Sequence, residues 1–133
     1  LSPDMITMDA VIPRTRLPEV LLAIDRMSDR YGLDVANVFH AGDGNLHPNI
    51  LYDRDDPASR TKAIAAYEEI CRFAIAVGGS VTGEHGVGIQ KMKFLREQLI
   101  SHDGKEALRL MKEIKKIFDP AGIMNPGKYV EGA

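Results

Sequence analysis

The sequence contains no tryptophan, a single cysteine and only eight other aromatic residues among 133. One cysteine, Cys71, cannot form an internal disulfide, and such usage is typical of a reducing compartment. No apolar run approaches the ~20 residues that a membrane span requires, and no signal peptide is visible at the start. These absences predict a cytoplasmic protein, held at the inner membrane only if partner subunits bring it there.

The chain also lacks an excess of charge of either sign. It has 17 Lys and Arg against 19 Asp and Glu, a net charge of −2, with both signs mixed along the sequence. A nucleic-acid partner is therefore not expected, because such proteins carry a basic patch or stripe. The length suffices for one domain with a real core, and we expect residues 1–133 to form a single domain.

The most informative stretch is Val38–Tyr52, where two apolar runs flank Gly42-Asp43-Gly44-Asn45. Gly and Asn tolerate the backbone angles of a tight turn, so this pattern predicts a β-hairpin. His40 would close the first strand and His47 would open the second. Asn49 lies two residues beyond His47 and would point to the same face of the sheet.

A second polar cluster lies in the glycine-rich segment Gly83–Gly88, where Glu84 and His85 are adjacent. Two hairpin histidines can be half of a metal site, and a nearby carboxylate could complete it. The alternative is that each histidine is a hydrogen-bonded structural residue. The residues by themselves leave both interpretations open.

The remaining pattern predicts an α+β fold of the ferredoxin-like βαββαβ type, with helices on one face of an antiparallel sheet. Two C-terminal helices follow this unit. The expected strands are residues 5–12, 34–40, 45–52 and a short extended piece at 80–82. The expected helices cover residues 17–31, 87–99 and 105–118, and a further one runs from a cap at Ser59 or Asp56 to about Val77.

This topology places a condition on Glu84. A full strand from Ser80 would carry Glu84 roughly 13–16 Å away from the histidines, at about 3.3 Å per residue. If Glu84 joins His40 and His47, the piece from Ser80 must be short or bent, and Gly83 could supply the bend.

Three motifs together resemble the C-terminal domain of FAD-linked oxidases, the vanillyl-alcohol-oxidase-type flavoproteins. They are His40-Ala-Gly-Asp-Gly-Asn-Leu-His47, Gly83-Glu-His-Gly-Val-Gly88 and Phe118-Asp-Pro-Ala-Gly-Ile-Met-Asn-Pro-Gly-Lys128. Within that family the resemblance is greatest to glycolate oxidase flavoprotein subunits and to D-lactate and D-2-hydroxyglutarate dehydrogenases. The motifs occur in the family's order and span most of the chain.

The resemblance implies a role for each motif residue in oxidising a small 2-hydroxy acid, with hydride passing from Cα to flavin N5. His40, His47 and Glu84 correspond to ligands of a divalent metal, which could be Zn, Mn or Fe. His85 corresponds to the general base that takes the hydroxyl proton, and Asn49 to a residue that contacts substrate.

The same resemblance places Asn125 and Lys128 in the segment that returns to the flavin. The family binds FAD mainly through a separate domain that precedes this region, and nothing in residues 1–133 resembles it. We therefore expect a piece of an enzyme that is inactive alone. Its partners would be the flavin-binding domain of the same parent protein and other oxidase subunits.

Two other interpretations compete with this one. The chain could be a stand-alone ferredoxin-like module that binds a metal or ligand without catalysis. It could also be a structural interaction domain whose glycines serve turns and whose histidines serve hydrogen bonds.

Overall fold

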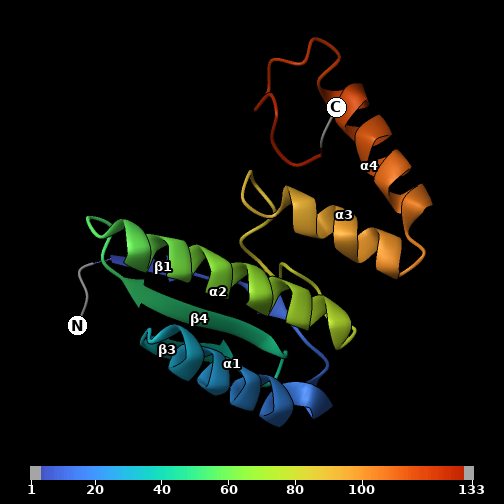
Figure 1. Cartoon of the computed structure of the whole chain (residues 1–133). Coiled ribbons are helices and arrows are strands. Elements are labelled where there is room, and N and C mark those ends of the chain that lie inside the picture. The colour runs from blue at the N-terminus through green and yellow to red at the C-terminus, as the bar shows by residue number, and fades with distance from the viewer. Residues whose placement is uncertain (1–3, 131–133) are drawn as a thin grey trace. The chain divides into compact units, whose positions relative to one another are not determined.

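The computed structural model describes residues 4–130, which form two compact units (Figure 1). The first unit ends at Glu84 and the second begins at His85. The first unit contains the sheet and the second contains two helices and the C-terminal segment.

The sheet of the first unit is built around β4 (Asn45–Tyr52). Strand β3 (Val35–His40) pairs with one edge of β4, and β1 (Asp4–Thr7) and β2 (Ala10–Val11) pair with the other, all antiparallel. Asp4 lies opposite Tyr52 and Val11 opposite Asn45, so both short strands follow one continuous register. The strand expected over residues 5–12 is therefore present as two short strands, β1 and β2, which pair with β4 in the same register.

The fourth strand expected at 80–82 is reduced to a single antiparallel bridge between Val11 and Ser80. Across the sheet, the bridged residue Ser80 comes first, the line formed by β1 and β2 is next, β4 follows, and β3 forms the far edge. This is the order of a ferredoxin-like unit, and it confirms the α+β class.

Helices α1 (Leu17–Tyr31) and α2 (Pro57–Ala76) lie together on one face of the sheet (Figure 1). A short 3-10 turn, η1 (Arg14–Arg16), leads into α1, and Asp56 caps α2 by accepting a hydrogen bond from the Ala58 amide. Burying an apolar face of the sheet against two helices removes that surface from water, which is the main force that holds such a unit together. The core includes Val20, Ile24 and Met27 from α1, Ala66, Ile70 and Ala74 from α2, and Leu46 and Ile50 from β4.

In the second unit, α3 (Met92–Ser101) begins five residues later than the expected start at Val87. Gly88 has a φ of +53°, outside the right-handed helical region, so a continuous helix cannot pass through it. Helix α4 (Lys105–Phe118) has the expected bounds. Within residues 4–130, no helix is both long and apolar enough to cross a membrane.

The apolar side of α4 is exposed. Ile117 and Phe118 are 74% and 76% accessible to solvent, and Leu110 and Ile114 are exposed as well. These four positions recur at helical spacing, so they form one stripe along the helix. An exposed apolar stripe of this kind commonly marks an interaction surface.

Candidate functional site

His40 and His47 lie on the hairpin formed by β3 and β4, on one face of the sheet. His40 pairs with Asn45, and Val38 pairs with His47, so alternation along the strands brings both imidazoles to the same side. Their ring centroids are 5.5 Å apart and the rings are nearly perpendicular. Leu46 and Ile50 alternate with these residues and point into the core, so the histidines lie on the face opposite the helices.

The orientation of the His47 ring is set by the backbone of the neighbouring strand. Its Nδ1 lies 3.1 Å from the carbonyl oxygen of Met8. A carbonyl can only accept, so Nδ1 carries a proton and donates it, which leaves the lone pair of a neutral ring on Nε2. That Nε2 faces Oε1 of Glu84 at 2.9 Å.

The structure brings Glu84 to both histidines. Its Oε1 is also 3.9 Å from Nε2 of His40, and it accepts a hydrogen bond of 3.3 Å from Nδ2 of Asn45. The condition set by the topology is met because the chain leaves the sheet after the bridge at Ser80 instead of continuing as a strand.

The three side chains form a donor set that suits a divalent cation. One ligand atom from each of His40, His47 and Glu84 lies within 4.8 Å of the others. The Nε2 lone pair of His47 and a carboxylate oxygen repel each other at 2.9 Å unless a proton or a metal ion lies between them. His40 and Glu84 are 59% and 53% exposed, so solvent reaches both side chains. Their role as metal ligands nevertheless stays a prediction.

Asn45 belongs to this cluster, although its sequence context suggested only a turn residue. It is buried, and its Nδ2 donates to Glu84 while its Oδ1 has no hydrogen-bond partner among residues 4–130. The pairing with His40 across the hairpin is the signal that could have identified it, since paired residues share a face.

Asn49 lies on the same face, two residues beyond His47. Its amide nitrogen donates to the carbonyl oxygens of Ala36 and His47, and its Oδ1 accepts from the Thr7 hydroxyl at 2.7 Å. The sheet therefore holds this side chain in one orientation. The predicted contact with substrate would use the remaining lone pair of Oδ1.

His85 directly follows Glu84 in the chain and is exposed. The chain has no regular secondary structure at this point, and His85 is the first residue of the second unit. Its role as a general base stays a prediction.

The C-terminal motif folds back on Asp119. The Asp119 carboxylate accepts from the amides of Ile123 and Met124, at 2.9 and 3.0 Å, and from the ammonium of Lys115. The ammonium first, and then the two amides, hold the pKa of Asp119 below its ordinary value. Asp119 therefore has a structural role, because its carboxylate holds the turn that follows α4.

Asn125 and Lys128 lie beyond this turn, and both are exposed. The Lys128 ammonium donates to Oδ1 of Asn125 at 3.4 Å. The structure thus brings the two residues together, and their predicted role toward the flavin stays untested by this contact.

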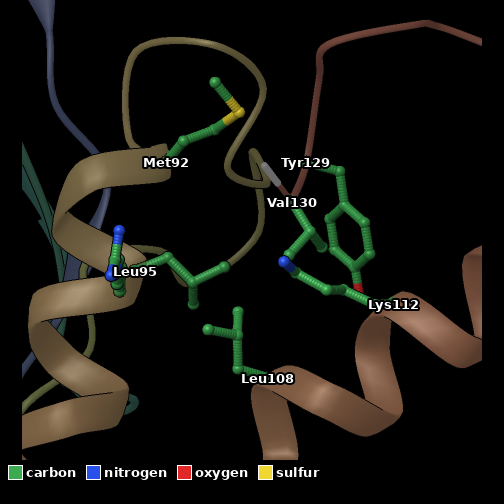
Figure 2. Close-up of a pocket in the computed structure, with 7 residues that line it drawn as sticks. Met92, Leu95, Leu108, Lys112, Tyr129 and Val130 are labelled. Atoms are coloured by element: carbon green, nitrogen blue, oxygen red, sulfur yellow. The ribbon is translucent and has the colours of Figure 1, made fainter. Parts of the chain in front are cut away.

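The second unit also contains a cavity of about 150 Å³ between α3, α4 and the C-terminal segment (Figure 2). Met92, Leu95, Leu108 and Val130 supply apolar walls, and Lys112 and Tyr129 also line it. Pockets that enclose small ligands have volumes of about 300–1,000 Å³. This cavity is therefore too small to enclose a dinucleotide.

Comparison with known proteins places these features in a family. Residues 1–129 match the family described as FAD linked oxidases, C-terminal domain. The chain is 43% identical over 130 residues to glycolate oxidase subunit GlcD of Escherichia coli (strain K12), covering 98% of this chain and 25% of that protein. It is 40% identical over 126 residues to the mitochondrial D-lactate dehydrogenase [cytochrome] of Arabidopsis thaliana, covering 95% and 21%.

The fold is also similar to a solved structure, that of 4-ethylphenol oxidase from Gulosibacter chungangensis in its isoeugenol complex. The TM-score is 0.70 at 25% sequence identity, and the match covers 96% of this chain and 25% of that one. The chain thus spans a quarter or less of the length of these three proteins.

Proposed function

Because the chain belongs to the FAD linked oxidases, C-terminal domain, family, we propose that it is the substrate- and metal-binding part of an FAD-dependent enzyme. The enzyme would be an oxidase or dehydrogenase of small D-2-hydroxy acids, of the kind named by the glycolate and D-lactate relatives. The observation that carries this proposal is that ligand atoms of His40, His47 and Glu84 all lie within 4.8 Å of one another.

We assign His40, His47 and Glu84 as the protein ligands of a divalent cation. Two imidazoles and one carboxylate with open positions suit Zn, Mn or Fe, and they are typical of a catalytic site and not of a closed structural one. When bound, such a cation supplies Lewis acidity toward the carboxylate and α-hydroxyl of a 2-hydroxy acid.

Neighbouring residues orient the side chains of two of these ligands, His47 and Glu84. The Met8 carbonyl selects the His47 tautomer that presents Nε2, and metal-binding histidines usually donate their other ring N–H in this way. Asn45 holds the Glu84 carboxylate from the side of the sheet. His85, next to Glu84 in the chain, would accept the proton of the substrate's hydroxyl group, and Asn49 would contact the substrate.

A bound flavin would supply the hydride acceptor for Cα of the substrate, and it would be held mainly by another domain of the parent protein. The cavity of about 150 Å³ is too small for it, and Asn125 and Lys128 are exposed where an edge contact could form. The stripe Leu110, Ile114, Ile117 and Phe118 of α4 is a surface that the flavin-binding domain or another oxidase subunit would cover.

We expect the purified chain to be colourless, with no stoichiometric absorbance in the visible bands of flavin. Joined to its flavin-binding domain, it should give a yellow protein whose flavin is bleached by D-lactate or glycolate in the absence of oxygen. L-Lactate is the matched control and should leave the flavin oxidised.

The outcome that contradicts this assignment is a flavin that no small 2-hydroxy acid reduces. Stoichiometric metal binding together with such an unreactive flavin would instead favour a metal- or ligand-binding module without catalysis.

A further inference from the structure

Asp9 is a fully buried acidic residue, with 0% of its surface accessible to solvent. It lies between β1 and β2, and the register of the two strands places it opposite His47 in β4. Burying a carboxylate is costly unless hydrogen bonds replace its contacts with water. The partners of this carboxylate therefore indicate what Asp9 does.

Three groups that donate hydrogen bonds to Asp9 lie in one short segment, Thr82–Glu84. Its Oδ2 accepts from the Thr82 hydroxyl at 2.7 Å, the Gly83 amide at 2.9 Å and the Glu84 amide at 3.2 Å. This segment has left the sheet and belongs to no helix. The buried charge thus takes the place of the strand hydrogen bonds that would otherwise hold this backbone.

The same segment lies directly against the sheet. A Cβ on Gly83 would be 2.7 Å from Cγ2 of Val11 and 2.8 Å from Oδ1 of Asn45, distances that real Cβ atoms do not show. Only glycine allows this approach. The three hydrogen bonds and the close contact together fix the position of the Glu84 backbone relative to the sheet.

We propose that Asp9 is the positioning residue of the metal site: it holds the backbone of Thr82–Glu84 so that the Glu84 carboxylate meets His40 and His47. The inference rests on the metal site proposed above. The Glu84 side chain is half exposed, and it starts from the backbone that Asp9 holds, so a shift of this backbone would also move the carboxylate. Metal sites tolerate displacements of only about 0.2 Å in ligand distance.

The test compares Asp9→Asn with the unaltered chain by calorimetric titration with Zn²⁺. In the variant an NH₂ group replaces one oxygen and the charge that gathers three donors is lost. We expect the affinity for Zn²⁺ to fall by about 10–100-fold, the usual effect of altering a residue that positions a metal ligand. Hydrogen exchange of the Gly83 and Glu84 amides, measured without metal, should become faster.

Three further variants make the result decisive. Thr82→Val keeps the charge and removes one donor, so it should weaken Zn²⁺ binding in the same direction by less. Gly83→Ala keeps every donor and removes the close approach, and it should also weaken binding. Asp34→Asn, at an exposed carboxylate beside the same sheet, is the control and should bind as the unaltered chain does.

The outcomes separate the two proposals. If the unaltered chain takes up no Zn²⁺, the metal site itself is wrong. If it binds while Asp9→Asn and Thr82→Val bind equally well, the positioning role of Asp9 is overturned, even where thermal unfolding shows lower stability. Weaker binding together with faster exchange at Gly83 and Glu84 supports the role.

Discussion

His40→Ala, His47→Ala and Glu84→Ala should each weaken the binding of Zn²⁺ or Mn²⁺ to the chain by more than about 100-fold. Each substitution removes one of three protein ligands, and altering a residue that only positions a ligand already lowers metal affinity by about 10–100-fold. Titration calorimetry on the purified variants measures the effect. His102→Ala is the matched control, because His102 is an exposed histidine outside the cluster.

The three ligand variants should differ in stability although they agree in metal affinity. His47 is 9% exposed and bonded to Met8, so His47→Ala leaves a cavity and an unpaired carbonyl and should lower the unfolding temperature. His40 is mostly exposed and should not show this loss. Unchanged metal affinity in any of the three, with the protein folded, would remove that residue from the ligand set.

His85→Asn should reduce turnover by about 10²–10⁴-fold in the polypeptide that also carries the flavin-binding domain, while the metal content stays the same. A metal ligand and a general base act at different steps, so their variants should change different kinetic and binding constants. Glu84→Ala should lose metal and substrate affinity together, whereas His85→Asn should lose mainly kcat. Steady-state kinetics beside metal analysis distinguishes the two patterns.

The pH dependence provides the control for the His85 assignment. The residual rate of His85→Asn should rise with pH, because hydroxide can partly replace a missing base. A His85→Asn enzyme that keeps full turnover with its metal in place would leave His85 as a structural neighbour of Glu84.

Much of this arrangement could be predicted from the sequence because its signals are local. The turn Gly42–Asn45 between two apolar runs is sufficient to predict the hairpin, and the period of two then places His40, His47 and Asn49 on one face. The order of strands and helices predicts the ferredoxin-like unit. The motif Gly83–Gly88 predicts a second polar segment, but its distance from the hairpin depends on a bend that no local signal determines.

Other features depend on partners that are distant in the sequence. Asp9 looks like an isolated acid in an apolar strand, and its role appears only when residues 73 to 75 positions later fold onto it. Apolar residues recur at helical spacing along α4, yet periodicity cannot tell a face that packs within the chain from one that another domain covers. Whether Ile117 and Phe118 are exposed depends on how the folded chain packs around α4, and local sequence does not determine this.

The most direct test of the metal site is a crystal of the chain soaked with Zn²⁺ and measured at the zinc absorption edge. We expect one anomalous peak at about 2.0–2.2 Å from Nε2 of His40, Nε2 of His47 and a carboxylate oxygen of Glu84. A peak bound by other residues, or a fully soaked crystal with no peak between these three side chains, would contradict the assignment.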